Sequence, residues 1–557
     1  MRRSRGAFVG LLLCGTLAMA DAWAQVPLPG TVQPGQIERQ FEKLPEPRAK
    51  PAEIRIPDTG QKPPPNADGV RFVLNRLTVD GVTVYPAATV RAIYEGFLGK
   101  EVTLAEIYRI ANTLTTRYRN DGYILSQVIV PAQSVEGGAM RLQAIEGYVA
   151  DVRVEAGSAE LRERVSRYAE KIKVSRPLTA AVLERYLLLI NDLPGVFARG
   201  VLVSSKIQQG ASDLVIQVTP RIFSAGLSFD NRGGRSLGPH RLLGDAEVYY
   251  PLGMGARTGL RLVNAGDGEL TFAMLSHDQW LGSEGGKLGV SYSVVRSKPE
   301  ELAFIPLNLE TASNALNISY SHPLKRSRAE NLYVRGTLAV HDGETKIFSV
   351  RDTEDHLRSV RLGLTYDKAD RLAGINILDI EYSQGFQGMG SSKNGDIFLS
   401  RPEGRVDFSK ATMYAARLQS LGGSWSALAA FNGQYAFTNL LASELFSFGG
   451  EQFGRGYDPS ELVGDHGAAL KFELRYSGVI AEAAYTAYGF YDVGQVRQRN
   501  PGGLAATTSA ASAGLGVRMN LGRRWSGVVE FAKPLTKIVA QENDREVRFY
   551  GGLSLRF

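Results

Sequence analysis

A lone arginine in a glycine-rich stretch is the residue with the clearest chemical potential in this 557-residue chain. Arg455 lies between Gly454 and Gly456, which allow the backbone to bend sharply around it, and Tyr457 follows. A cation held on a tight turn needs a carboxylate or water as its partner. Asp492 is the best candidate, because it lies one hairpin further along the chain. We predict an ion pair between the two residues; the alternative is an ordinary glycine turn on a surface loop.

The segment that carries Asp492 predicts the direction of its side chain. Successive side chains of a strand point to opposite faces, so Phe490 and Asp492 share one face and Tyr491 lies on the other. We expect the face of Asp492 to be the inner one. The predicted lock between the glycine-rich stretch and this strand comprises Arg455, Gly456, Tyr457, Phe490 and Asp492.

The segments around this stretch alternate between apolar and charged side chains, as membrane strands do. In the segment 469–477 one face is apolar and the other holds Lys471, Glu473 and Arg475. From 221 to 557 such segments follow one another roughly every 21 residues. Too many long strands carry charge on one face for a soluble sandwich, so a barrel with lipid outside and water inside fits better. We count 16 alternating segments, an even number, as single-chain bacterial barrels have.

The N-terminus has the three parts of a secretory signal peptide, predicted at 1–24. Three arginines open the chain, an apolar stretch covers 8–20, and a small-x-small site at 22–24 precedes the predicted cleavage point. The apolar stretch is too short to span a bilayer. The only cysteine, Cys14, is removed with this segment, so the mature chain is expected to form no disulfide.

Residues 25–70 are rich in proline and contain one short helical island. Ile37, Phe41 and Leu44 follow helical spacing and would share one face. Such a short helix is not stable alone, so we expect it to dock against another part of the protein. The following segment, 45–65, is predicted to be an extended spacer.

The segments 71–147 and 148–220 repeat one order of predicted elements: strand, helix, helix, strand, strand. In the first repeat we predict strands at 72–79 and 122–130, and a capping box at 103–106 opens the second helix. Repeats of this length are sufficient for two small α+β domains. Neither contains a catalytic constellation.

With this order of parts, the chain resembles the two-partner secretion transporters of the bacterial outer membrane, the TpsB group within the BamA-like superfamily. The resemblance covers essentially the whole mature chain. Motifs of the family's POTRA domains match at 122–123, 131–133 and 145–147. The family's loop signature matches at 455–457 and departs at Gly454, where valine is usual.

The resemblance implies a membrane β-barrel of 16 antiparallel strands, preceded by two α+β POTRA domains and an N-terminal plug helix at Ile37–Leu44. It also implies that the insert 439–466 is an extracellular loop that folds back into the lumen. The family's lumenal aspartate corresponds to Asp492, with Phe490 two residues before it. The expected domains are a signal peptide at 1–24, the plug helix and linker at 25–70, POTRA 1 at 71–147, POTRA 2 at 148–220 and the barrel at 221–557.

The function implied by the resemblance is export of an unfolded exoprotein, recognised in the periplasm by the POTRA domains and passed through the barrel. The expected partners are an adhesin, haemolysin or toxin with an N-terminal export signal, outer-membrane lipids, and the barrel assembly machinery. An alternative is an insertase for other outer-membrane proteins. Insertases of the BamA type resemble chains with more POTRA domains, so two such domains favour secretion.

Two further sites are predicted outside the lock. A three-stranded sheet has an exposed edge to which an extended cargo chain can add as a strand, and the groove beside Tyr123 and Leu125 could hold its side chains. The chain ends on Phe557, the last residue of an alternating segment. We predict that this terminal aromatic is a signal for barrel assembly.

Three other classes of function receive no support. The segment 234–238 has the pattern of a hydrolase nucleophile elbow, but that chemistry needs a strand-to-helix turn, and here we expect a turn between two strands. None of the 6 histidines has a metal-ligand spacing, so we expect no metal, cofactor or catalytic residue. A net charge of +7 without basic runs interleaved with aromatics excludes a nucleic-acid binder.

Overall fold

The computed structural model describes residues 28–42, 44–48, 61–205, 208, 210–253, 255–301, 304–501 and 505–557. The predicted signal peptide at 1–24 and the part of the predicted spacer at 49–60 lie outside the described residues. None of the described helices is both long and apolar enough to cross a membrane.

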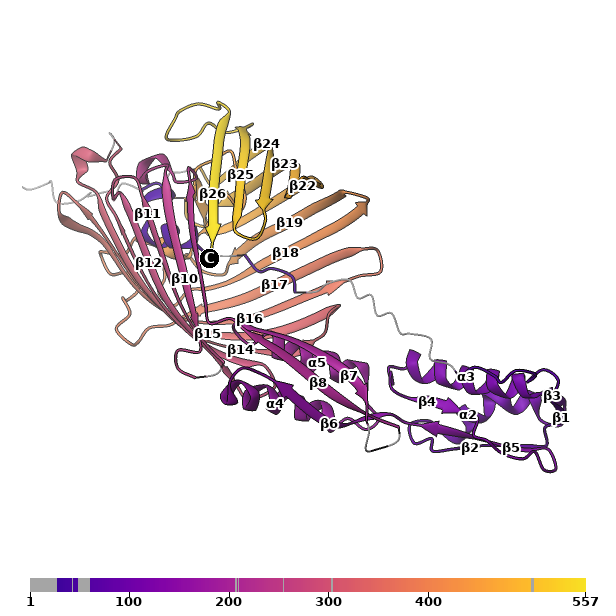
Figure 1. Ribbon diagram of the computed structural model, residues 1–557. Coiled ribbons are helices and arrows are strands. Elements are labelled where there is room, and N and C mark those ends of the chain that lie inside the picture. The colour runs from indigo at the N-terminus through magenta and orange to yellow at the C-terminus, as the bar shows by residue number, and fades with distance from the viewer. Residues whose placement is uncertain are drawn as a thin grey trace, which may run out of the picture.

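Sixteen antiparallel strands close into a barrel (Figure 1), and the last strand pairs with the first. This confirms the predicted architecture and strand number. The barrel strands are β9 (Phe223–Asp230), β10 (Arg241–Tyr249), β11 (Ala256–Ala265), β12 (Leu270–Leu281), β13 (Gly286–Ser297), β14 (Glu310–Arg326), β15 (Glu330–Ile347), β16 (Val350–Ala369), β17 (Gly374–Gly385), β18 (Ser409–Gly422), β19 (Trp425–Ala436), β22 (His466–Ile480), β23 (Ala483–Arg497), β24 (Thr507–Leu521), β25 (Trp525–Pro534) and β26 (Arg548–Arg556).

The burial of strand β22 shows which face of the barrel is apolar. Leu470, Phe472 and Leu474 lie on the outer face and are 40%, 46% and 50% exposed, whereas Glu473 on the lumenal face is 3% exposed. This arrangement is the reverse of a soluble protein, in which exposed faces are polar. The outer surface is therefore suited to lipid and the lumen to polar groups.

The first α+β unit has a three-stranded sheet in the order β2-β5-β4, and a separate strand pair, β1 with β3. Its elements are β1 (Arg71–Val73), β2 (Arg76–Asp80), α2 (Ala87–Tyr94), β3 (Glu101–Thr103), α3 (Leu104–Asn120), β4 (Gln127–Ile129) and β5 (Ala139–Ile145). Thr103 and Glu106 form the predicted capping box at the start of α3. Side chains from both helices and from the sheet share one hydrophobic core.

Two predicted strands of this unit are wrong in extent. The segment 72–79 is two strands, because β1 pairs with β3 and β2 pairs with β5. In the segment 122–130 only β4 is a strand. The residues before β4 turn back onto α3, where the backbone N–H of Tyr123 donates to the carbonyl of Tyr118 at 2.8 Å.

The second α+β unit has the sheet order β6-β8-β7 and joins the barrel directly. Its elements are β6 (Tyr148–Glu155), α4 (Ala159–Lys173), α5 (Ala180–Asn191), β7 (Val196–Ser204) and β8 (Ala211–Pro220). Arg326 of β14 holds Asp192, at the end of α5, through two hydrogen bonds of 2.8 and 2.9 Å. Arg185 and Tyr186 of α5 contact Glu284 in the β12–β13 turn. The second unit is therefore fixed to one end of the barrel, here called the proximal end, and the opposite end is the distal end (Figure 1).

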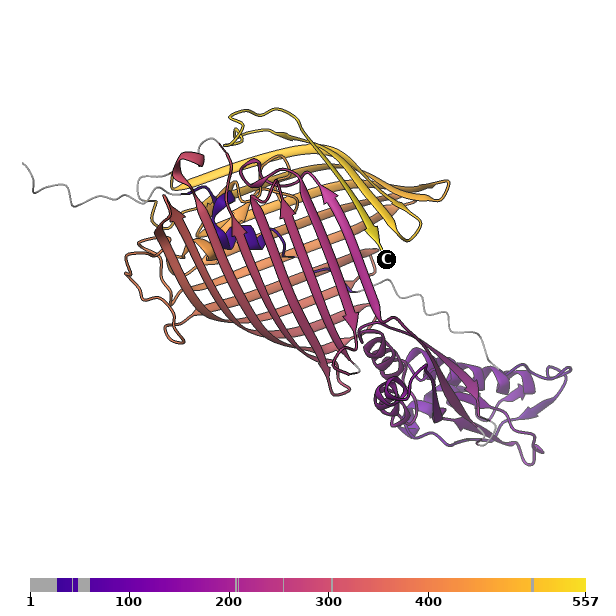
Figure 2. The same ribbon diagram turned by 60° about the vertical axis from the view of Figure 1, so that its left-hand side comes forward.

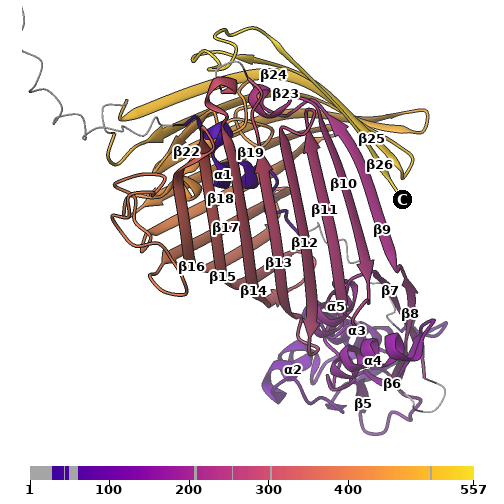
Figure 3. The same cartoon turned by 90° about the vertical axis from the view of Figure 1, so that its left-hand side faces the viewer.

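A short helix, α1 (Pro34–Arg39), lies inside the barrel, as Figures 2 and 3 show. The prediction of a helix at Ile37–Leu44 is wrong in its bounds. The helix begins at Pro34, whose missing N–H costs nothing in the first turn. Beyond Arg39 the backbone tightens, because the N–H groups of Phe41 and Glu42 donate to carbonyls three residues back, at 3.1 and 3.2 Å. The carbonyls of Phe41 and Glu42 accept hydrogen bonds from Arg261 of β11 and from Gln452.

Candidate functional site

The loop between β19 and β22 enters the lumen from the distal end and carries Arg455. It contains a short hairpin, β20 (Phe446–Phe448) with β21 (Leu462–Gly464), and the glycine-rich stretch lies between these two strands. Gly454 has a φ of +83°, and a Cβ there would lie 2.7 Å from the ring of Phe448. A Cβ on Gly456 would lie 2.8 Å from Ser512 of β24. Glycine is thus needed at both positions to bring the loop tip against the wall.

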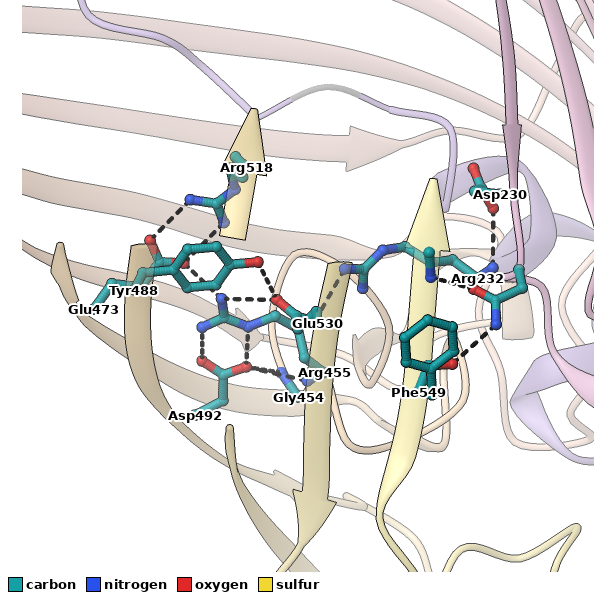
Figure 4. Close-up of polar contacts among 12 residues, drawn as sticks. Asp230, Arg232, Gly454, Arg455, Glu473, Tyr488, Asp492, Arg518, Glu530 and Phe549 are labelled. Carbon is teal, nitrogen blue, oxygen red and sulfur yellow. Dashed lines mark hydrogen bonds and ion pairs between the residues drawn. The ribbon is translucent and has the colours of Figure 1, made fainter. Parts of the chain in front are cut away.

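The structure places Arg455 directly against Asp492 of β23 (Figure 4). Its Nη2 and Nε atoms donate to the two carboxylate oxygens of Asp492 at 2.7 and 2.9 Å. The backbone N–H groups of Gly454 and Arg455 each add a hydrogen bond of 3.1 Å to the same carboxylate. Arg455 is 2% exposed and Asp492 is fully buried. A forked, buried contact of this kind is much stronger than an exposed ion pair.

Arg455 also contacts two carboxylates that the sequence interpretation did not assign to the site. Its Nη1 atom donates to Glu473 of β22 at 2.6 Å and lies 3.7 Å from Glu530 of β25. The guanidinium carbon lies 3.6 Å from the ring centre of Phe490, which gives a cation–π contact. The loop tip therefore contacts three strands of one side of the wall, β22, β23 and β25.

Other wall residues neutralise the excess negative charge around Arg455. Arg518 of β24 reaches Glu473 at 3.3 Å and also lies over the ring of Tyr488. Tyr488 donates to Glu530 at 2.7 Å, and Arg232, from the β9–β10 loop, donates to the same carboxylate at 3.0 Å (Figure 4). Removing one member of such a buried network leaves an uncompensated charge, at a cost of about 3–5 kcal/mol.

Tyr457 fastens the other side of the loop tip. It is 1% exposed, and its hydroxyl lies 3.0 Å from the carbonyl oxygen of Ala511 on β24. The same hydroxyl accepts a hydrogen bond of 3.2 Å from the backbone N–H of Lys537. The five residues predicted as the lock, Arg455, Gly456, Tyr457, Phe490 and Asp492, thus lie together in the structure.

A second buried charge cluster centres on Glu444, in the first part of the same loop. Lys410 of β18 lies 2.7 Å from its carboxylate, Arg361 of β16 lies 2.7 Å away, and Arg39 of α1 lies 3.5 Å away. Glu444 is 3% exposed. This carboxylate therefore joins the lumenal helix, the loop and two strands of the wall. The sequence interpretation missed it because nothing local pairs an acidic loop residue with strands far along the chain.

The lumenal helix contacts both the wall and the loop. Ile37 is fully buried in a cluster with Val263 and Phe272, and Phe41 packs on Phe272 with ring centres 4.7 Å apart. Gln36 donates to the backbone carbonyls of Ala442 and Leu445, at 2.8 and 3.1 Å. Leu44, beyond the helix, packs instead against the cluster around the glycine-rich stretch. The three residues predicted to form one helical face are therefore in the lumen but not on one helix.

The predicted cargo groove does not bring Tyr123 and Leu125 together as an open site. Tyr123 packs edge-on against Tyr118 and Tyr85, within its own domain. Leu125 packs against the hydrophobic core of the second α+β unit. At this joint the backbone N–H of Ala180 donates to the carbonyl of Gly122 at 2.8 Å. Leu125 is thus part of the contact between the two units.

Phe557 lies at the proximal rim and is 60% exposed. Its backbone N–H donates to Ala225 of β9 at 2.9 Å, and its carbonyl oxygen accepts from Arg221 at 2.6 Å. The hydrolase-like motif at 234–238 lies in the β9–β10 loop, where Ser236 donates to Glu301 and His240 stacks on Phe229. Ser236 and His240 are thus occupied separately, without a nucleophile–base contact.

Comparison with known proteins places this architecture in a family. The ShlB-type POTRA domain matches residues 72–147, and the haemolysin secretion/activation protein family ShlB/FhaC/HecB matches residues 210–519, more than half of the chain. The chain belongs to this family. The resemblance stated from the sequence is therefore confirmed.

Individual proteins support the same assignment. The heme/hemopexin transporter protein HuxB of Haemophilus influenzae is 26% identical, over 80% of this chain and 80% of HuxB. The outer membrane transporter CdiB of Dickeya dadantii is 24% identical, over 84% of each chain. The solved structure of CdiB from Escherichia coli has the same fold, with a TM-score of 0.71 and 18% identity over 94% of this chain and 95% of CdiB.

Membership of the family shows which end of the barrel faces the periplasm and which faces the outside of the cell. The chain is an outer-membrane transporter of the ShlB/FhaC/HecB family, with its POTRA domains in the periplasm. The proximal end is the periplasmic end, and the distal end is the extracellular end. Members of this family are transporters rather than known enzymes.

Proposed function

We propose that this chain exports one dedicated, unfolded exoprotein through its barrel, and that α1 and the Arg455 loop form the gate. The observation that carries the proposal is that both α1 and the loop lie inside a closed barrel whose periplasmic end carries the second POTRA domain. A 16-stranded barrel is wide enough for an aqueous channel. In this proposal the plug helix and the loop obstruct that channel.

The lumen contains a cavity on its periplasmic side that supports a path for an extended chain. The cavity has a volume of about 1110 Å³ and lies between Phe41, beside the plug, and the wall from β9 to β13. Small polar residues line much of this wall: Ser224, Ser228, Ser276, Ser291 and Ser293. A wall of small side chains leaves room for the backbone of a cargo. Export then requires that the plug leave the lumen above the cavity.

The lock gives the loop a role distinct from that of the plug. The forked pair between Arg455 and Asp492 ties the loop tip to β23, while the ladder hydrogen bonds hold the barrel itself. Losing the pair should therefore free the loop without opening the barrel wall. We propose that the anchored tip keeps the loop in a conformation that export needs.

Cargo capture is proposed at the outer edge of β2 in the first POTRA domain. The sheet has two edge strands, β2 and β4. The outward N–H groups along β4 are already bonded: that of Val128 donates to Thr115 of α3, and that of Val130, directly after β4, donates to the side chain of Gln61 in the linker. An incoming strand would have to displace both contacts at β4. Strand addition at β2 needs no such displacement.

The proposed partner is a secreted exoprotein with an N-terminal export signal. The relatives HuxB and HpmB are named as a heme/hemopexin transporter and a hemolysin transporter, which supports a protein of the adhesin, haemolysin or toxin type as cargo. The rival function, assembly of other outer-membrane proteins, predicts a different set of affected proteins. Outer-membrane lipids and the barrel assembly machinery are the further proposed partners.

Comparison of the proteins released by a deletion strain and its parent tests the function. We expect one large exoprotein to disappear from the medium and to return on complementation, while the other outer-membrane barrels keep their normal levels. A general decrease of barrel proteins, with the medium unchanged, would support the insertase instead. A purified 71–220 fragment should bind the N-terminal region of the missing exoprotein and not its folded remainder.

A further inference from the structure

A basic hollow lies on the outer surface of the barrel, at the extracellular ends of β19, β22 and β23. It has a volume of about 660 Å³ and is lined by Tyr435, Asn439, His466, Arg497, Arg499 and Asn500. Tyr435 is 56% exposed, and Leu470, on the same face as His466, is 40% exposed, so this is the lipid side of the wall. His466 pairs in register with Arg497, which places both side chains at the rim.

Two arginines of the hollow have no carboxylate partner among the described residues. The guanidinium group of Arg499 donates to neutral acceptors, the side chain of Asn439 at 3.2 Å and the carbonyl of Ala436 at 3.1 Å. Asp465, next to His466, accepts the backbone N–H of Arg499 at 3.0 Å, but it is fully buried and Arg401 binds both of its carboxylate oxygens. The positive charge of the hollow is thus left for a ligand.

The other lining residues add fixed hydrogen-bonding groups. His466 accepts the backbone N–H of Ala436 at its Nδ1 atom, so the neutral ring carries its proton on Nε2 and can donate there. Its ring packs against Tyr435, with centres 4.7 Å apart. Asn500 supplies a further amide to the lining. Guanidinium groups beside such donors match the geometry of a phosphate oxyanion.

The aromatic residues of β19 place this hollow at headgroup height. Trp425 packs on Tyr476 at the periplasmic end of the wall, and Tyr435 packs on Phe437 at the extracellular end. Trp425 and Tyr435 are ten residues apart on one strand, about 33 Å along it and about 25 Å along the membrane normal at a usual tilt. This spacing equals the height of the apolar band between two aromatic girdles. The hollow therefore lies beside the headgroups of the outer leaflet.

We propose that this hollow binds the phosphorylated headgroup of an outer-leaflet lipid, with Arg497 and Arg499 as the phosphate ligands. The acyl chains would then run down the exposed apolar face of β22, beginning at Leu470. The site is separate from the lumen, so lipid binding there does not depend on whether the chain exports a cargo. It would fix the barrel beside β19 and β22, the two strands between which the lumenal loop leaves the wall.

The test uses the full-length protein, purified in detergent and freed of lipid. Binding of bis-phosphorylated lipid A is measured by native mass spectrometry and titration, against the same lipid without phosphates and against inorganic phosphate as a competitor. We expect wild type to prefer the phosphorylated lipid, and Arg497→Gln with Arg499→Gln to bind it about tenfold more weakly. Arg296→Gln is the matched control, since Arg296 is an exposed arginine at the extracellular end of β13.

Each other outcome overturns the proposal. Unchanged binding in the double variant would show that the hollow is not the site. An equal loss in Arg296→Gln would show that any rim charge suffices. Displacement of the lipid by inorganic phosphate at a similar concentration would make this a site for free phosphate. Heat-modifiable mobility verifies that each variant keeps a folded barrel.

Discussion

Arg39 of the lumenal helix faces Glu444 of the lumenal loop, with 3.5 Å between guanidinium nitrogen and carboxylate oxygen. The same loop carries Arg455, which is bound to the wall at Asp492. The lumenal helix and the lumenal loop are therefore joined to each other inside the barrel. Glu444 is their shared contact, and Lys410 and Arg361 tie that contact to β18 and β16.

Breaking the lock should stop secretion without stopping barrel assembly. Arg455→Ala and Asp492→Ala each leave a buried charge without its partner, a cost of about 3–5 kcal/mol that falls on the loop rather than on the strand ladder. Arg455→Lys should rescue poorly, because a point charge cannot make the forked contact. Cargo in the medium and heat-modifiable mobility of the barrel are the two measurements.

A control variant and a double-mutant cycle test whether secretion depends on the Arg455–Asp492 pair in particular or on lumenal charge in general. Arg335→Ala removes another lumenal arginine, which pairs with Glu381 on the wall at 2.8 Å, and should leave secretion near normal. A double-mutant cycle on protease protection of the loop should show coupling of about 1–3 kcal/mol between Arg455 and Asp492. Strictly additive losses would remove the lock from the mechanism.

Deleting residues 30–48 should open the channel. The deletion removes α1 and its contacts with Phe272, Ala442 and Leu445, which lie on the wall and the loop. Single-channel conductance in planar bilayers is expected to rise, while secretion continues, because the plug must leave the lumen during export in any case. If conductance is unchanged, another element closes the channel.

Glu444→Gln should release the plug by a single substitution. It removes the charge that compensates Arg39, Arg361 and Lys410, while the side chain keeps its size. We expect more frequent channel openings than in wild type, with normal barrel assembly. Asp278→Asn is the matched control, because Asp278 pairs with Arg257 and Lys287 of the wall. Equal conductance changes in both variants would contradict a specific role for Glu444.

The first POTRA domain should lose a defined part of its stability in acid. Burial raises the pKa of Glu146, but hydrogen bonds from Thr83, Tyr118 and the backbone of Val84 outweigh it and hold the pKa below its ordinary value of 4.5. Because the folded-state pKa is the lower one, this contribution is complete above about pH 4.5 and is lost as the pH falls through the folded-state pKa.

Urea unfolding of the 71–220 fragment measures that contribution. At pH 7, Glu146→Gln should lower the free energy of unfolding by about 1–3 kcal/mol, since hydrogen bonds to a charged acceptor are lost. The difference between wild type and variant should shrink as the pH falls below 4.5. A difference that stays constant down to pH 3 would show that the charge of Glu146 does not matter.

Phe557→Ser should lower the yield of assembled protein rather than the stability of the finished barrel. Phe557 is 60% exposed at the periplasmic rim, so its removal changes little packing. Phe549→Ser is the control, because Phe549 lies on β26, the strand that Phe557 follows, and is 53% exposed. Outer-membrane yield and heat-modifiable mobility are measured for both. If the two variants assemble equally well, the terminal aromatic is not the assembly signal.

The period of the barrel strands was predictable because it is a local property. A strand in this barrel must show alternate side chains to lipid and to the lumen, so Leu470 and Glu473 each reveal their face from their position alone. The same parity places Asp492 on the inner face with Phe490. The glycines around Arg455 likewise indicate a tight turn from residue type alone. For these reasons one ion pair of the lock could be predicted from the sequence.

The rest of the site depends on distances that only the closed barrel sets. Glu473 and Glu530 lie on β22 and β25, and they flank Arg455 because barrel curvature and strand register bring their lumenal faces around one point. The alternation of side chains along the strand predicted that Glu473 faces inward, but no local pattern identifies the residue with which Glu473 pairs. Glu444 is a loop residue, so no strand alternation predicts even the direction of its side chain.

The lumenal helix and the predicted POTRA groove also show that local sequence patterns do not give tertiary contacts. Helical spacing predicted one face for Ile37, Phe41 and Leu44, but the helix ends at Arg39, and Leu44 packs against a different cluster from Ile37. Leu125 was placed in an open groove, yet it packs against the core of the second α+β unit. Sequence thus determined which residues face the lumen and which face lipid, because that choice repeats with every strand. Apart from the pair of Arg455 with Asp492, the tertiary structure decided which lumenal groups meet, because those contacts join segments far apart in the chain.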